Sequence, residues 1–65
     1  SSKNRREELI SAEGIAITTM RPSGTAKING EKVDVVSEAE MIVKNTKIKV
    51  VDVKGNRIVV KPVKT

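Results

Sequence analysis

The segment Gly24-Thr-Ala-Lys-Ile-Asn-Gly-Glu-Lys-Val-Asp-Val-Val-Ser37 decides how the chain folds. Asn29-Gly30 at its centre is typical of a type I′ hairpin turn, because both positions need a positive φ that Asn and Gly tolerate. A two-residue loop also fixes which residues lie opposite each other. The resulting pairs are Ile28 with Glu31, Ala26 with Val33 and Gly24 with Val35. We therefore predict two antiparallel strands, over residues 24–28 and 31–37.

A further strand is predicted upstream of this hairpin, over residues 14–20. Ile15, Ile17 and Thr19 alternate along it and would share one face. The following Arg21-Pro22-Ser23-Gly24 has the Pro-then-Gly order of a tight turn. The pairs expected across this turn are Ile17 with Ile28 and Thr19 with Ala26. Because both turns put the same residues on the inner face, the sequence predicts a meander of three strands.

A second hairpin is predicted at the C-terminus, where Gly55-Asn56 joins strands over residues 47–54 and 57–63. The apolar phase slips between Val50 and Val51, which indicates one extra residue, a β-bulge. The expected pairs are Val53 with Ile58 and Val51 with Val60 on the turn side, and Ile48 with Pro62 and Lys49 with Lys61 beyond the bulge. Between the two sheets, residues 37–42 are expected to form a single helical turn or a short loop that plugs one end, since Ser37 and Glu40 have capping-box spacing.

The predicted fold is all-β, a small five-stranded OB-fold-like barrel with a short helical turn or loop between its third and fourth strands. Other five-stranded barrels remain open at this point. Composition supports strands, because ten valines and seven isoleucines supply most of the 37% of hydrophobic residues in a chain of 65. We expect residues 1–13 to be a polar linker or frayed helix and residues 14–65 to be the single barrel domain.

The residue types that are missing exclude several kinds of chemistry. The chain has no cysteine and no histidine, so it has no disulfide, no thiol nucleophile, no imidazole base and no zinc site of the usual kind. Ser23 therefore has no histidine to activate it. We expect no catalytic residue, no cofactor and no metal in this domain.

The positive charge is concentrated at one end of the chain. The formal charge is +5, and the last nineteen residues account for all of it. The candidate partner surface consists of Lys47, Lys49, Lys54, Arg57 and Lys61. Such a cluster could bind nucleic acid, anionic lipid headgroups or an acidic protein patch, or it could be a solvated face that protects an edge strand. The absence of aromatic rings on which bases stack argues against nucleic acid, and an anion or single-stranded nucleic acid binder is kept as the alternative function.

Several motifs in the right order resemble the C-terminal soluble domain of NfeD-like membrane proteins. They are the glycine-led strand from Gly14 to Met20, the Arg-Pro-Ser-Gly turn, the segment from Gly30 through Val33-Asp34 to Ser37, a Glu-x-x-x-Ile segment at residues 38–42, and the Val53 to Arg57 hairpin. The motif residues, to which we assign mainly structural roles, are Gly14, Arg21, Pro22, Ser23, Gly24, Gly30, Val33, Asp34, Gly55 and Asn56. Departures from the family pattern are Met20, Ala39, Met41 and Asn45.

The resemblance implies an OB-fold domain tethered behind transmembrane helices that are not part of this chain. It implies a non-catalytic interaction module whose partner is a membrane protein of the SPFH class, the stomatins and flotillins. In longer members a ClpP-like serine protease domain precedes the helices. The expected location is the cell membrane with this domain on the cytoplasmic side, although the residues themselves do not distinguish the two sides.

Overall fold

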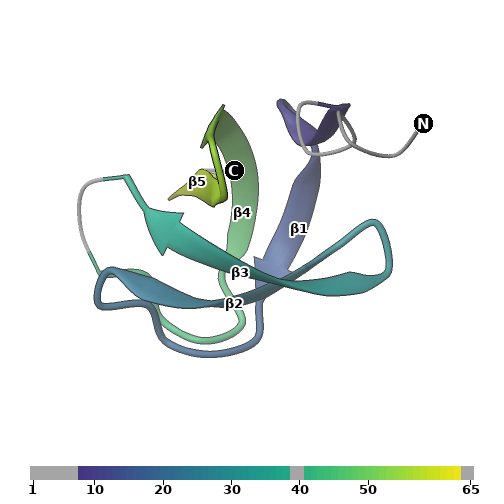
Figure 1. The fold of residues 1–65 in the computed structure, drawn as a ribbon. Coiled ribbons are helices and arrows are strands. Elements are labelled where there is room, and N and C mark those ends of the chain that lie inside the picture. The colour runs from purple at the N-terminus through teal and green to yellow at the C-terminus, as the bar shows by residue number, and fades with distance from the viewer. Residues whose placement is uncertain (1–7, 39–40, 64–65) are drawn as a thin grey trace.

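Figure 1 shows a computed structural model of the chain, which describes residues 8–38 and 41–63 as a β-barrel. The five strands are β1 (Glu13–Ala16), β2 (Ser23–Ile28), β3 (Glu31–Ser37), β4 (Lys47–Lys54) and β5 (Arg57–Pro62). They close in the order β1-β2-β3-β5-β4, with β1 beside β4. Strands β3 and β5 run parallel, and the other neighbours are antiparallel. The predicted all-β, five-stranded, OB-fold-like barrel is confirmed.

Small and β-branched side chains fill the barrel. The buried apolar residues are Ala16, Met20, Ala26, Ile28, Val35, Ile42, Ile48, Val50, Ile58 and Val60. They alternate with exposed or half-buried residues along most of the strands, as expected for a sheet with one face inside. Isoleucine and valine, together with the unbranched Met20, therefore fill most of the interior, since the chain has no aromatic ring.

The β2–β3 hairpin has the predicted register. Asn29 and Gly30 take φ values of 53° and 82°, as a type I′ turn requires. All three predicted pairs are present, namely Ile28 with Glu31, Ala26 with Val33 and Gly24 with Val35. The local turn is thus sufficient to set this part of the sheet.

Strand β1 differs from the prediction in length, register and facing. It ends at Ala16 and pairs Gly14 with Ile28 and Ala16 with Ala26, so the predicted register is wrong by three residues. Ile15 is 42% exposed, whereas Ala16 is fully buried. The predicted inner face was therefore the outer one. The tight Arg21–Gly24 turn is also wrong, because residues 17–22 form the connection and Ser23 and Gly24 already belong to β2.

Two contacts explain why the chain leaves the strand after Ala16. The N–H groups of Ile17 and Thr18 both donate to the carbonyl of Thr25, which bends the backbone out of the ladder. Met20 then enters the barrel, is fully buried, and forms an isolated β-bridge with Ile42. A large side chain at position 20 closes the barrel end where the prediction had a regular strand.

The β4–β5 hairpin confirms the predicted bulge. Its register shifts between Val50 and Asp52, which leaves Val51 as the extra residue. The predicted Val51–Val60 pair is wrong by one position, because Val50 pairs with Val60. The other predicted pairs are present, namely Val53 with Ile58, Ile48 with Pro62 and Lys49 with Lys61.

The connection from β3 to β4 is an extended bridge followed by a turn over residues 41–46. Ile42 exchanges both backbone hydrogen bonds with Met20 and is 2% exposed, so it fills one end of the barrel. Thr46 N–H donates to the carbonyl of Val43, and Asn45 has a φ of 74°. Residues 39–40, and with them the Glu40 of the predicted capping box, lie outside the described residues.

The described part of the N-terminal segment lies against β4. Leu9 and Ala12 pack on the core, and the N–H of Ser11 donates to the carbonyl of Val50. The N–H of Val50 in turn donates to the carbonyl of Ala12. Residues 1–7 lie outside the described residues, and the division of the chain at residue 14 stays a prediction.

Candidate functional site

The five basic residues of the predicted partner surface lie on the outer side of β4 and β5. Lys49 is opposite Lys61, and Lys54 is opposite Arg57, across the two strands. Their alternate neighbours point into the core, so the charged side chains project outward. Lys49 is half-buried and the other four are exposed. On the far edge of β4, Lys47 is opposite Ile15 of β1.

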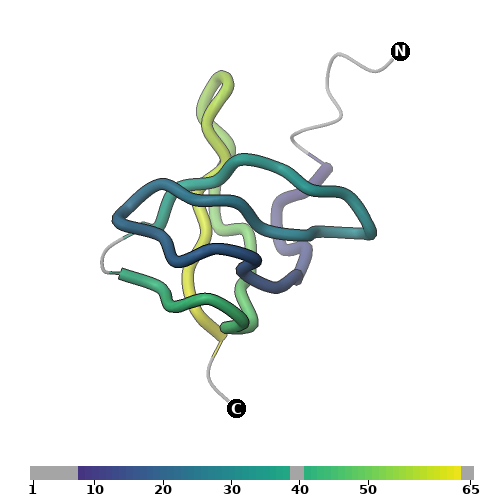
Figure 2. The backbone as a smooth tube through the Cα atoms, turned by 90° about the horizontal axis from the view of Figure 1, so that it is seen from below, coloured from purple at the N-terminus to yellow at the C-terminus, as the bar shows by residue number. Residues whose placement is uncertain are grey.

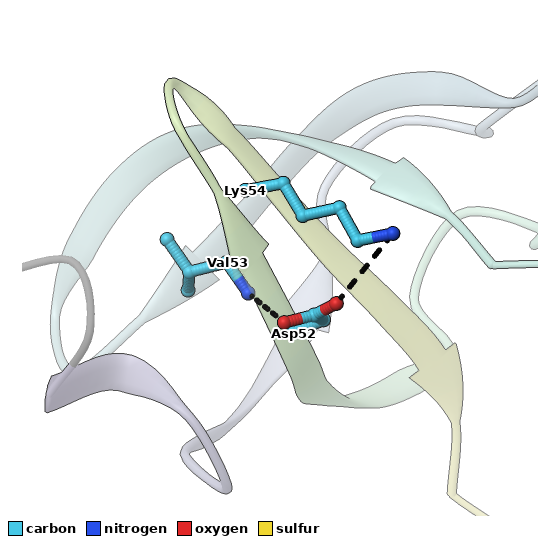
Figure 3. Close-up of polar contacts among 3 residues, drawn as sticks. All are labelled: Asp52, Val53 and Lys54. Carbon is cyan, nitrogen blue, oxygen red and sulfur yellow. Dashed lines mark hydrogen bonds and ion pairs between the residues drawn. The ribbon is translucent and has the colours of Figure 1, made fainter.

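Asp52 reduces the electrostatic repulsion between Lys54 and Arg57 at the turn end of the β4–β5 hairpin. One of its oxygens accepts a hydrogen bond from the N–H of Val53 at 2.8 Å, and the other lies 3.8 Å from Nζ of Lys54 (Figure 3). The Lys54 side chain is 73% exposed, so the ion pair is worth little in water. It nevertheless holds one carboxylate next to the Lys54–Arg57 pair.

The β4–β5 hairpin and the neighbouring edge of β3 border an open, shallow groove of about 390 Å³. Figure 2 shows the tip of the hairpin standing away from the rest of the barrel. The polar residues on its walls are Ser23, Asp34, Lys54, Asn56 and Arg57. Its floor is apolar and consists of the half-buried Val36 together with Val35 and Ile58, which belong to the buried core. We call this the hairpin groove.

The hairpin groove brings together two sets of residues that are separate in the sequence. Ser23, Asp34 and Asn56 belong to the motif residues, and Lys54 and Arg57 belong to the basic set. Val36, which no sequence pattern had singled out, contributes to the floor between them. Pairing of Val36 with Val59 across β3 and β5 is the tertiary contact that positions it.

The remaining basic residues lie elsewhere. Lys47 lines a second depression of about 370 Å³ together with Ile15 and Lys27, at the turn end of the β2–β3 hairpin. Lys49 has Glu13 on one side and Lys61 on the other. The structure thus divides the basic set, with two members at the hairpin groove and three outside it. Their role as a partner surface stays a prediction.

Most of the other motif residues have visible structural roles. An alanine Cβ at Gly24 would lie 2.5 Å from Cγ of Met20, and the carbonyl of Pro22 accepts a hydrogen bond from Ser37 N–H at 2.7 Å. Val33 packs against the core. Gly30 and Gly55 have φ values of 82° and 59° at the two hairpin tips. Arg21, whose peptide bond to Pro22 is cis, is exposed.

Asp34 has a direct contact within the sheet. One of its carboxylate oxygens lies 3.5 Å from the hydroxyl of Thr25, its partner on β2. The groove thus presents one carboxylate, one hydroxyl, one amide and two cations around an apolar floor. This set of groups can bind a chain segment by charge and apolar contact, whereas it offers no nucleophile paired with a base.

Comparison with known proteins identifies relatives over nearly the whole chain. Residues 6–62 match the family model described as NfeD-like C-terminal, partner-binding domain. Membrane protein NfeD1b of Bacillus subtilis (strain 168) is 45% identical over 62 residues, which are 95% of this chain and 14% of that protein. The chain therefore spans about a seventh of the length of this relative. Within residues 8–38 and 41–63, no helix has the length and apolar character to cross a bilayer.

Two solved structures have the same fold. The C-terminal domain of a stomatin operon partner protein from Pyrococcus horikoshii superposes with a TM-score of 0.83 at 30% identity, covering 91% of this chain and 94% of that one. The soluble domain of a Corynebacterium glutamicum membrane protein, implicated in regulation of membrane protease activity, gives a TM-score of 0.79 at 16% identity, with 89% and 98% covered. The second likeness concerns the fold alone. From the family match and the 45% identity, this chain belongs to the NfeD-like C-terminal, partner-binding domain family.

Proposed function

We propose that this chain is the non-catalytic module through which an NfeD-like membrane protein binds a membrane protein of the SPFH class. The observation that carries the proposal is the hairpin groove, where motif residues Ser23, Asp34 and Asn56 meet the cations Lys54 and Arg57. The family description as partner-binding supports an interaction role. The Pyrococcus relative, named a stomatin operon partner, supports the SPFH class as the partner.

The full-length protein is proposed to carry transmembrane helices upstream of this domain, preceded in longer members by a ClpP-like protease domain. NfeD1b is named a membrane protein and is several times longer than this chain, which supports the upstream part. We place the domain on the cytoplasmic side. Because this domain has no cysteine, an introduced Lys61→Cys is its single thiol, and its labelling is read as the difference from the parent full-length protein. An impermeant maleimide should react with it only after the cells are opened, and reaction in intact cells would contradict this location.

Co-purification tests the partner. The full-length protein, tagged at its membrane end, should capture the SPFH protein encoded beside it, and removal of residues 14–63 should abolish capture. As a control for expression, the protein that lacks these residues should be extracted from membranes in the same amount as the parent protein. Capture that survives the deletion would show that this domain is not the contact.

The alternative, an anion or single-stranded nucleic acid binder, makes a different prediction. An oligonucleotide should then shift the amide resonances of β4 and β5 at low salt, with an affinity that falls steeply as salt rises. We expect no such shifts, because the chain lacks rings for base stacking and the groove includes Asp34.

A further inference from the structure

We infer that the hairpin groove binds an extended, acidic segment of the partner, which adds as a strand to the open edge of β3 at Asp34. This deepens the proposed function and rests on it, because it specifies how the domain would hold its partner. The inference combines three observations, namely an unpaired backbone edge, an apolar floor and a positively charged wall.

The edge of β3 is open along its first half. Strand β3 pairs with β2 from Glu31 to Val36, but with β5 only at Val36 and Ser37. Next to a two-residue turn, the first pair of an antiparallel hairpin is hydrogen-bonded and pairs alternate from there. The N–H and C=O groups of Lys32 and Asp34 therefore point away from β2, and no strand in the described part of the chain lies beside them. Such an edge is a template for strand addition.

The opposite wall of the groove offers a matching group. Ile58 is paired with Val53 one position beyond the two-residue turn at Gly55-Asn56, so this pair is not hydrogen-bonded. The N–H of Ile58 therefore faces the gap between β5 and β3. Because the β3–β5 pairing begins only at Val36 and Val59, the β4–β5 hairpin diverges from β3 toward its tip (Figure 2). A strand entering from that end would pair with Lys32 and Asp34 and would reach no further than Ile58, because the next residue of β5, Val59, already pairs with Val36.

The side chains of the groove select the charge of the occupant. Lys54 and Arg57 stand on one wall against the single carboxylate of Asp34 on the other. Lys54 remains available, since its contact with Asp52 is 3.8 Å long and its side chain is 73% exposed. Carboxylates on the bound segment would meet these two cations, and its alternate side chains would cover the apolar floor. An acidic polypeptide can hydrogen-bond to the open edge of β3 and also pair with the two cations. A nucleic acid backbone can pair with the cations but cannot add as a strand.

The first test is a titration of the ¹⁵N-labelled chain with a short capped peptide of alternating valine and glutamate. We expect the largest amide shifts at Lys32, Asp34 and Ile58. The same peptide with lysine in place of glutamate should bind at least about tenfold more weakly, since its charges repel the wall. Shifts centred on Lys47 and Ile15, or equal binding of the two peptides, would overturn the inference.

Two pairs of variants separate backbone pairing from charge. Asp34→Pro removes the N–H on the open edge without removing a bond to β2, and should weaken peptide binding at least about tenfold. Asp34→Ala keeps the N–H and should bind as well or better. Arg57→Glu should weaken binding about tenfold or more, whereas Lys61→Glu, on the same strand with the same change in charge, should alter it less than about threefold. If Asp34→Pro does not fold, the comparison of Arg57→Glu with Lys61→Glu decides whether the peptide binds in the hairpin groove.

The same variants in the full-length protein distinguish this inference from the proposed function. Loss of SPFH capture with Asp34→Pro and Arg57→Glu, but not with Lys61→Glu, supports both. Capture that is unaffected by them but abolished by Met41→Glu, at a residue 51% exposed on the β3–β4 connection, overturns the groove and leaves the proposed function standing. Absence of capture by the parent protein refutes the proposed function, while the peptide titration still decides the groove.

Discussion

The backbone of β2 leaves no room for a side chain at Gly14 of β1, and replacement of this glycine by alanine should strongly destabilise the barrel. A Cβ at this position would overlap the carbonyl oxygen of Lys27 and would lie 2.8 Å from Cγ1 and 3.1 Å from Cα of Ile28. Two of these three atoms belong to the backbone of β2, so a change of side-chain rotamer cannot relieve the overlap. Strand β1 would have to move away from β2 while it is also paired with β4.

The cost follows from the size of this shift. Overpacking that forces the backbone to move costs typically about 1 to 3 kcal/mol, and the backbone contacts place Gly14→Ala at the upper end, about 2 to 3 kcal/mol. A domain of this size has about 3 to 5 kcal/mol of stability in total. With about 4 to 8 °C lost per kcal/mol, the melting temperature should fall by roughly 10 to 20 °C.

Thermal and urea unfolding followed by circular dichroism measure this loss. The matched control is Gly55→Ala, where nothing lies within 4 Å of the added Cβ and only the φ of 59° is unfavourable. That variant should lose about 1 kcal/mol. If Gly14→Ala melts within about 3 °C of the parent, or loses no more than Gly55→Ala, close strand approach is not the reason for glycine at position 14.

Three further perturbations test the core, a strained turn and the surface charge. Ile48→Ala, at a residue with no exposure, should cost about 2 to 5 kcal/mol and leave the chain largely unfolded by its amide spectrum, whereas Ile15→Ala at an exposed position should retain a dispersed spectrum. Asn45→Gly should raise the melting temperature by no more than a few degrees, because glycine takes a φ of 74° without the Cβ penalty, which is small for asparagine, and its greater freedom in the unfolded chain offsets part of this gain; a lower melting temperature would contradict this. Asp52→Asn should cost at most about 1 kcal/mol in urea unfolding at low salt, and a loss that persists in 1 M salt would show that the Lys54 ion pair is not its origin.

The sequence predicts the parts of the barrel that are governed by neighbouring residues. Asn29-Gly30 and Gly55-Asn56 determine two hairpins because the turn geometry itself fixes the first pair and the alternation that follows. The slip of the apolar phase after Val50 predicts the bulge correctly, but it places Val51 opposite Val60, where the structure has Val50. Valine and isoleucine in these strands then determine which face is buried.

The candidate site could be predicted only in its components. Lys54 and Arg57 are predicted from the sequence as part of a basic surface, and Asp34 and Asn56 as motif residues. Nothing in the sequence indicates that these four residues line one groove. That neighbourhood depends on the parallel pairing of β3 with β5, which joins a strand in the middle of the chain to one near its C-terminus. For the same reason the sequence predicts Lys47 on one surface with Lys54 and Arg57, whereas in the structure it lines a different depression.

Strand β1 shows most clearly where local information ends. Its alternating Ile15, Ile17 and Thr19 predicted an inner face, and a plausible turn seemed to agree, yet Ala16 and Met20 are the buried residues. The register of β1 is set by two partners at once, β2 and β4, and by the close approach that Gly14 permits. By itself, the sequence thus determined the two hairpins, the bulge and the β-branched core, because each depends on residues near one another in the chain. Barrel closure decided the rest, since a strand held between two others must satisfy both ladders and fill the interior at the same time.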